Sequence, residues 1–242
     1  MLLSLLQRST HSRKLLFEHV PKCGGTSMSD YFRRHYVVSA TFDRYGARPH
    51  EQEEFLALPE PARHAYEFVL GHGVHPLLDH CDPGMVAVTI LREPVARIVS
   101  HYYFVKATPG HYLHDRVMRE QMTLRDYAAS DISTELRNDM VCRFLGVTPD
   151  EAEADPEGSV DAAWDVLQSR YDVVGVLERL APAMEAIRVA AGLSDRWKDR
   201  RINRTKGRMP IEKVTAEDRR VIEAHNALDI ELYRRVEAAA PR

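Results

Sequence analysis

The sequence has few of the features that mark membrane, disulfide-rich or nucleic-acid-binding proteins. Its apolar start, residues 1–6, ends at Gln7, which is too short for a membrane span or for the apolar core of a signal peptide. The 3 cysteines are few, odd in number and widely spaced, so we expect neither a disulfide framework nor a zinc site. This cysteine usage predicts a reducing cytoplasm. The formal net charge of −3 argues against a general nucleic-acid-binding protein.

Lysine is also scarce, and arginine carries most of the positive charge. The chain has 6 lysines and 27 arginines, so a positive surface must be local and built mainly from arginine. A content of 44% hydrophobic and 29% charged residues is typical of a soluble globular protein. The length of 242 residues suits a single domain that spans residues 1–242, and no internal repeat divides it.

Residues 14–36 predict a strand, a tight loop and a helix in succession. The apolar run over residues 15–20 indicates a buried strand, which stops at Pro21. After the loop, residues 28–35 place apolar side chains on one helix face. This succession aims backbone N–H groups and a helix N-terminus at a phosphate. The loop therefore predicts an anion site built from Lys22, Cys23, Gly24, Gly25, Thr26 and Ser27.

The order of residues in this loop differs from the common ATP-binding pattern. A Walker A loop has its lysine after the glycines, whereas Lys22 precedes Gly24 and Gly25. The order Pro-Lys-x-Gly-Gly-Thr-Ser resembles the 5′-phosphosulfate loop of sulfotransferases that use 3′-phosphoadenosine 5′-phosphosulfate (PAPS). The likeness is closest to the carbohydrate branch that includes heparan sulfate 2-O-sulfotransferase. Taken alone the loop is a weak signal, and an ordinary glycine-containing turn is the alternative.

A further strand is expected within residues 66–75, followed by a Gly-His pair. In open α/β sheets ligands bind beyond the carboxyl ends of the strands, where His72 would fall. The resembled family has a Gly-His pair at this place, and its histidine is the proposed general base, which implies that role for His72. Because glycines flank it, His72 is expected to have little side-chain packing. His75 competes for the role, His19 and His101 do so less strongly, and a turn histidine without a catalytic role is the alternative.

The second specific motif covers residues 85–102. Residues 85–91 are a nearly continuous apolar run, which is typical of a central parallel strand covered on both faces. The following residues resemble the family's 3′-phosphate motif, Leu-Arg-(Asp/Glu)-Pro-x-x-Arg-x-x-Ser-x-Tyr, which implies that Arg92 and Ser100 bind that phosphate. ATP has no 3′-phosphate, so the motif favours PAPS over a nucleoside triphosphate. The alternative is an arginine that caps the strand end and a serine that faces solvent.

Two weaker likenesses follow. Residues 138–146 resemble a family element in which Arg143 binds the cofactor or an acidic acceptor, and a structural salt bridge is the equal alternative. Residues 200–208 carry 5 basic side chains, which suit a solvated loop or a guide for an acidic polysaccharide. The family's pattern implies instead that three residues of this segment contact the cofactor, namely Asn203, Thr205 and Arg208.

Other segments give local predictions. Residues 36–42 are expected to form a strand, and the acidic, proline-containing residues 148–159 a surface loop. A final helix is expected to begin at Thr215 as its N-cap. Its packing stripe would contain Val221, Leu228, Leu232 and Val236.

Together these patterns predict a three-layer α/β/α, P-loop-like domain with a central parallel sheet, the sulfotransferase fold. The resemblance implies transfer of a sulfuryl group from PAPS to an acceptor hydroxyl on a carbohydrate or glycoconjugate, with 3′,5′-adenosine bisphosphate as the product. In this reaction His72 would take the acceptor proton and Lys22 would stabilise charge on the bridging oxygen. No metal, nucleic acid or membrane span is expected, and a cytoplasmic enzyme of bacterial type fits best.

Two rival functions stay open. A P-loop kinase or NTPase is disfavoured by the position of Lys22 and by the lack of an obvious Walker B element. A non-catalytic nucleotide-binding relative is the other, because Cys23 and Cys142 stand where threonine is common in the resembled family.

Overall fold

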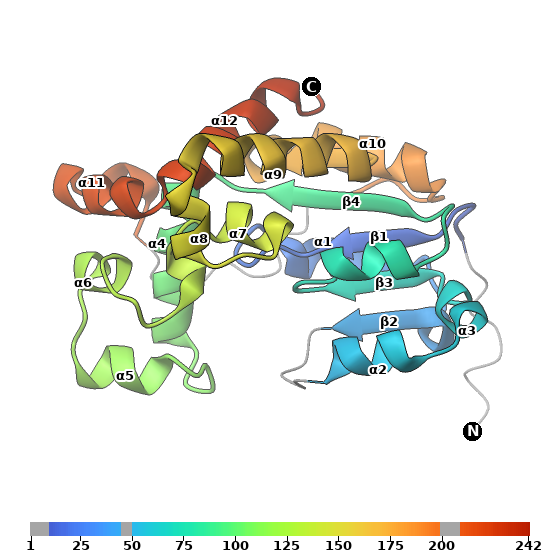
Figure 1. Ribbon diagram of the computed structural model, residues 1–242, viewed down its shortest axis with the longest axis horizontal. Helices are drawn as coiled ribbons and strands as arrows, with labels where there is room; N and C mark the ends of the chain where they lie inside the picture. Colours follow the sequence, from blue (N-terminus) through green and yellow to red (C-terminus); the bar gives the residue numbers. More distant parts are fainter. Residues whose placement is uncertain (1–9, 45–49, 199–208) are drawn as a thin grey trace.

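A five-stranded, all-parallel sheet forms the centre of the molecule (Figure 1). The computed structural model describes residues 10–44, 50–198 and 209–242. The strand order is β2-β3-β1-β4-β5, so the first strand in the chain lies in the middle of the sheet. All carboxyl ends meet at one edge because every pairing is parallel. The strands are β1 (Leu15–Glu18), β2 (Thr41–Arg44), β3 (Phe68–Gly71), β4 (Val86–Leu91) and β5 (Val173–Val176).

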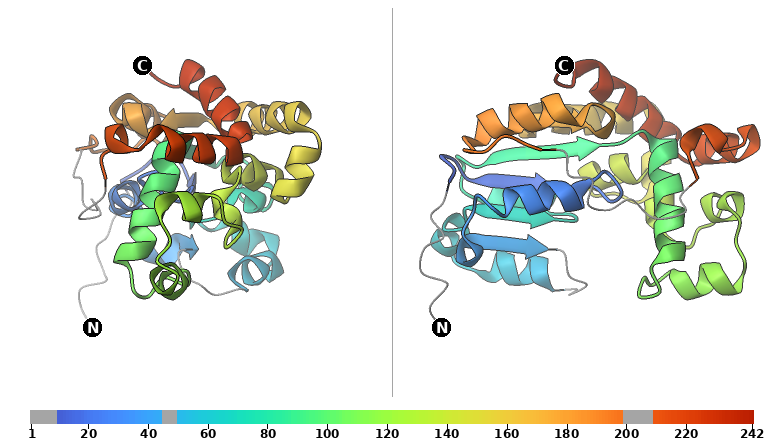
Figure 2. Two further views of the ribbon diagram at one scale, coloured as in Figure 1. Left: turned by 90° about the vertical axis from the view of Figure 1, so that its left-hand side faces the viewer. Right: turned by 180° about the vertical axis from the view of Figure 1, so that it is seen from behind.

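Helices cover both faces of this sheet, as the alternation of buried side chains in β1 requires. Leu15 and Phe17 pack on one face with α1 (Gly25–Phe32) and α10 (Leu180–Ala191). Leu16 points to the other face, which four helices cover: α2 (Glu51–Ala57), α7 (Asp139–Leu145), α9 (Pro156–Arg170) and α12 (Ala227–Ala239). The predicted three-layer α/β/α arrangement is therefore confirmed (Figure 2).

Four helices form a lobe beyond the carboxyl edge of the sheet (Figure 1). They share a separate hydrophobic cluster that includes Val99, Leu124 and Ile222. The first of them, α4, begins three residues after β4 and so connects the sheet directly to the lobe. The helical lobe consists of α4 (Pro94–Ala107), α5 (His114–Arg119), α6 (Leu124–Ala128) and α11 (Ala216–His225).

The strand predicted over residues 36–42 begins later than expected. Val38–Ala40 form a 3-10 turn, and β2 starts only at Thr41. Val38 is 77% exposed, so its β-branched side chain contributes to no core. The prediction was wrong because strand propensity reflects burial against neighbours, which this side chain lacks.

The surface loop predicted over residues 148–159 is also wrong. Helix α8 (Pro149–Ala154) and the first turns of α9 occupy this stretch. Both prolines stand in the first helical turn, where the missing N–H costs nothing. The residue before each helix caps it, because Thr148 accepts from the N–H of Glu151 and Asp155 accepts from that of Gly158. The prolines therefore mark helix starts.

The final helical stretch divides at the buried Asn226 into α11 and α12. Thr215 caps α11 as predicted, because its hydroxyl accepts from the N–H of Asp218. In α11 the buried residue is Ile222, and Val221 is only partly buried. The predicted positions in α12, Leu228, Leu232 and Val236, are buried.

The remaining elements are short. Helix α3 (Glu60–His64) follows α2, and four more 3-10 turns span His75–His80, Thr134–Leu136, Leu177–Arg179 and Ile211–Lys213. Cys23, Cys81 and Cys142 are buried free thiols. Within residues 10–44, 50–198 and 209–242, no helix is both long and apolar enough to cross a membrane.

Candidate functional site

The loop between β1 and α1 presents a helix N-terminus at the carboxyl edge of the sheet. Gly24 adopts a left-handed conformation (φ 84°) and precedes α1 without supplying a side-chain cap, and the first turn of α1 has no acidic residue. Lys22 also has a positive φ of 66°, which is strained for a residue with a side chain. Thr26 is exposed and Ser27 half-buried. This loop therefore fits an anion that accepts from backbone N–H groups and hydroxyls.

Gly25 is required by a close approach inside the protein. A Cβ atom at this position would lie 1.9 Å from the imidazole of His19, which rests against the loop backbone. Burial holds the pKa of His19 well below its ordinary value, and the charges of His72 and Lys22 act in the same direction. His19 is therefore a neutral ring that packs against the loop backbone at Gly25.

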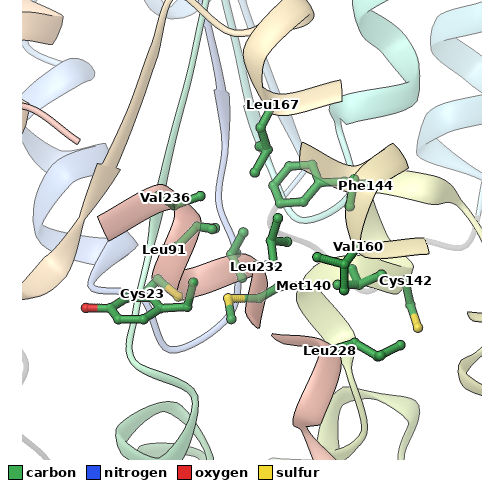
Figure 3. Packing of buried hydrophobic residues seen from close by; sticks show 14 of the residues in the cluster. Cys23, Leu91, Met140, Cys142, Phe144, Val160, Leu167, Leu228, Leu232 and Val236 are labelled. Carbon is green, nitrogen blue, oxygen red and sulfur yellow. The ribbon is translucent and has the colours of Figure 1, made fainter. Parts of the chain in front are cut away.

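Cys23 turns its side chain away from this anion site. The thiol is fully buried among core residues such as Leu91, Met140 and Leu232 (Figure 3). Burial raises the pKa of the thiol to about 12, so it stays protonated. The predicted contribution of Cys23 to an anion site is thus confined to its backbone, and the cysteine in place of a threonine is a packing feature.

Arg92 joins the second motif to the first. Its guanidinium donates a hydrogen bond to the carbonyl oxygen of Lys22 over 3.0 Å. Glu93 caps α4 by accepting from the N–H groups of Val95 and Ala96. Ser100, two turns into α4, is 6% exposed. The structure thus brings Arg92 to the loop.

His72 packs more closely than its flanking glycines predict. Its ring lies 4.4 Å from the ring of His19, and its Nδ1 lies 2.5 Å from the carbonyl oxygen of His19. A carbonyl can only accept, so in the neutral ring Nδ1 carries the proton and Nε2 the lone pair. Burial lowers the pKa of His72, although the bond to His19 works in the opposite direction. His72 is thus a neutral imidazole of fixed tautomer.

Sequence reasoning missed Glu18, which holds the turn that carries His72. Its carboxylate is fully buried and accepts from the N–H of Gly73 at 2.9 Å and from that of His75 at 2.7 Å. Burial raises the pKa of Glu18, while the charge of Arg143 and the backbone bonds oppose this. The only sequence feature that points to this role of Glu18 is its position as an acidic residue at the end of an apolar strand.

Arg143 forms the salt bridges that were one of its two predicted roles. It lies 3.0 Å from Asp139 and 3.7 Å from Glu18, and its side chain is 14% exposed. Arg143 thus balances the buried charge of Glu18 beneath the His72 turn.

The competing histidines lie elsewhere. The Nδ1 of His75 lies 2.9 Å from the hydroxyl of Tyr171, and burial lowers the pKa of His75 to about 4. His101 lies in the helical lobe, where it contacts Glu135 at 2.7 Å and the hydroxyl of Tyr127 at 2.7 Å. His19, by contrast, lies beside His72, with its ring tilted by 35° to the His72 ring.

A cavity that sequence reasoning also missed begins at Ser27. It has a volume of about 400 Å³ and runs along α1 toward Arg34, bounded on its other side by residues 194–198. The rings of Tyr31 and Trp197 meet edge to face there at 5.4 Å. A lone tryptophan just before a basic run was its only sequence signal.

The third predicted group of cofactor residues, Asn203, Thr205 and Arg208, lies outside the described residues. In the part of the chain that the structure describes, no group of three or more His, Cys, Asp or Glu side chains is arranged to hold a metal ion.

Comparison with known proteins gives one finding. The model of the Sulfotransferase family matches residues 8–237, which covers almost the full length and includes residues 22–27 and 91–102. A search of curated proteins finds no match.

Proposed function

Because the chain belongs to the sulfotransferase family, a family of PAPS-dependent transferases, we propose that it transfers a sulfuryl group to a hydroxyl of a carbohydrate or glycoconjugate. The observation that carries the donor assignment is the hydrogen bond between Arg92 and the carbonyl of Lys22. This bond joins Arg92 to the loop of residues 22–27, which supports the proposal that both segments contact one nucleotide. The likeness to the carbohydrate branch supports the choice of acceptor.

The residues present fit PAPS. An anion at the start of α1 meets a helix N-terminus without a side-chain cap and without a nearby carboxylate in its first turn. The backbone of residues 24–27 would hold the 5′-phosphate, and Arg92 with Ser100 the 3′-phosphate. The cavity that starts at Ser27 offers the half-buried ring of Trp197, which packs on the buried Tyr31, to a planar base.

The chain's own residues supply positioning and proton transfer. When bound, PAPS supplies the sulfuryl group for an in-line displacement of the kind known for phosphoryl groups. His72, neutral and with its lone pair on Nε2, takes the proton of the acceptor hydroxyl. The ammonium group of Lys22 stabilises the negative charge that develops at the leaving oxygen.

Calorimetric binding of 3′,5′-adenosine bisphosphate, compared with ADP plus magnesium, tests the donor assignment. We expect the bisphosphate to bind more tightly. We expect Arg92→Ala to weaken bisphosphate binding by about 10- to 100-fold, the loss of one hydrogen bond to a charged group. Its effect on ADP should be small, because ADP lacks the 3′-phosphate. Tighter binding of ADP with magnesium would instead indicate a kinase or NTPase.

Radiolabelled sulfuryl transfer from PAPS tests the reaction itself. We expect His72→Ala and Lys22→Ala each to abolish turnover, while His75→Ala, which alters a buried histidine away from the loop, should retain it if the protein folds. Full activity of His72→Ala would remove His72 from the role of base.

A further inference from the structure

A row of aromatic rings leads from Lys22 out to solvent. The ammonium nitrogen of Lys22 lies 3.4 Å from the centre of the Phe104 ring. Phe104 meets His111 edge to face at 5.6 Å, and His111 stacks on Tyr112 at 4.7 Å. These three rings, which we call the aromatic wall, are carried by α4 and by the connection between α4 and α5. The wall therefore starts at one of the proposed catalytic residues.

Tyr112 is the outermost ring and is held in a fixed place. It is 69% exposed, although large aromatic rings are usually more buried. Its hydroxyl lies 2.9 Å from that of Ser133, and one face of its ring is covered by His111. The ring thus presents apolar surface to solvent without freedom to fold back. Such surface beside a reactive site marks a place where a ligand binds.

Polar groups of defined character accompany the rings. The Nδ1 of His111 accepts from the N–H of Leu113 at 3.2 Å, so its Nε2 carries the proton and is a donor. Burial lowers the pKa of His111, which keeps this donor neutral near pH 7. The carboxylate of Glu135 is held by His101 at 2.7 Å. Rings with a neutral donor and a fixed carboxylate suit a ligand that has both C–H faces and hydroxyl groups.

The wall and His72 both lie within electrostatic range of one carboxylate. The charge of Glu135 acts on the pKa of His111 and on that of His72. The charge of Lys22 likewise acts on the pKa of His111 and on that of His19, whose ring lies 4.4 Å from the ring of His72. The contact between Lys22 and Phe104 therefore joins the wall to the loop, and Glu135 acts on both the wall and the proposed base.

We propose that the aromatic wall binds the acceptor as a neutral oligosaccharide, with the reacting sugar at Lys22 and a neighbouring sugar on the exposed face of Tyr112. Sugars present an apolar C–H face and a rim of hydroxyl groups, which match the rings and the polar groups of the wall. Two rings, Phe104 and His111, lie between Lys22 and Tyr112, so we expect a ligand that reaches both ends to be longer than one sugar ring. The carboxylate of Glu135 disfavours a uronic acid or a sulfated sugar beside the wall.

This proposal rests on the proposed sulfotransferase function, and its test separates the two. Saturation-transfer NMR is recorded on the full chain with 3′,5′-adenosine bisphosphate bound. The probes are N-acetylchitohexaose, maltohexaose, monomeric N-acetylglucosamine, a heparosan hexasaccharide and p-nitrophenol. We expect a neutral hexasaccharide to receive saturation and to bind more tightly than the monosaccharide. Tyr112→Ala should weaken that binding at least tenfold, Tyr112→Phe should keep it, and Met118→Ala, an exposed residue of α5, serves as the matched control.

Several outcomes would overturn the proposal while the donor function stands. These are equal binding by wild type and Tyr112→Ala, saturation of no saccharide, or preferred binding of the heparosan hexasaccharide or p-nitrophenol. Bisphosphate binding by each variant, measured in the same samples, reports whether the fold and the donor site are intact. A wild-type protein that fails to bind the bisphosphate would instead refute the donor assignment.

Discussion

Replacing Glu18 tests how the turn that carries His72 is held in place. The carboxylate is fully buried, accepts from two backbone N–H groups and pairs with Arg143. Glu18→Ala removes these interactions, while Arg143 keeps its contact with Asp139 at 3.0 Å. Glu18→Gln keeps the shape but removes the charge and turns an amide N–H₂ toward one of the two backbone donors.

The expected losses follow from these contacts. Removing one partner of a buried ion pair costs about 3–5 kcal/mol, and we expect Glu18→Ala to lose that much free energy of unfolding. Leaving one buried donor without an acceptor costs about 1–3 kcal/mol, which is our expectation for Glu18→Gln. Because these bonds fix residues 73–75, sulfuryl transfer in Glu18→Gln should fall while bisphosphate binding stays near that of wild type.

Urea unfolding followed by circular dichroism measures the first effect, and transfer rates with calorimetry measure the second. Glu212→Gln, an exposed glutamate on the 3-10 turn Ile211–Lys213, is the matched control. Wild-type stability and turnover in Glu18→Gln would refute the argument that Glu18 positions the turn. Equal losses of turnover and bisphosphate binding would mean that the whole site has been disturbed, and not the turn alone.

Three further predictions concern the pH profile, the loop and the core. Only neutral His72 can take a proton, and burial lowers the pKa of His72. The plot of kcat/KM against pH should therefore rise on its acid side with a midpoint below the ordinary histidine pKa of about 6.5. A midpoint above about 7 would contradict this. Gly25→Ala should weaken bisphosphate binding in calorimetry at least tenfold because the new methyl group overlaps the His19 ring, whereas Gly110→Ala, with nothing within 4 Å, should bind normally. Asp229→Ala should lower the free energy of unfolding in urea by about 3–5 kcal/mol, since it breaks a fully buried pair with Arg97, and a loss under 1 kcal/mol would show that the pair is dispensable.

Local patterns in the sequence predicted much of the frame of the site. The strand–loop–helix unit at residues 15–32 and the strand–helix unit at residues 86–107 follow from apolar runs, glycines and a proline, all of which act over a few residues. The sheet edge at which His72 lies follows from the general behaviour of parallel sheets.

The contacts that hold the site together could not be predicted from local patterns, because they depend on how segments far apart in the chain align. Glu18 pairs opposite Gly71 in the sheet, and only this alignment puts its carboxylate under the next turn. The aromatic wall likewise needs the position of α4 relative to the loop, which joins Phe104 to Lys22 across 82 positions of the chain. The prolines of α8 and α9 led to the wrong prediction of a loop, because proline disrupts the interior of a helix but is favoured at its first position.

Helix α4 sets the spacing between the proposed donor site and the proposed acceptor site. Ser100, which is proposed to bind the donor, lies in the first half of this helix. Phe104, the first ring of the aromatic wall, lies one turn later. A helix rises about 1.5 Å and rotates about 100° per residue, so the spacing between donor and acceptor is set by a residue count. Inserting a single residue between these positions would swing Phe104 off Lys22 while leaving Arg92 in place. Relatives with other acceptors are therefore expected to vary the segment after α4 and to keep the length of the helix before it.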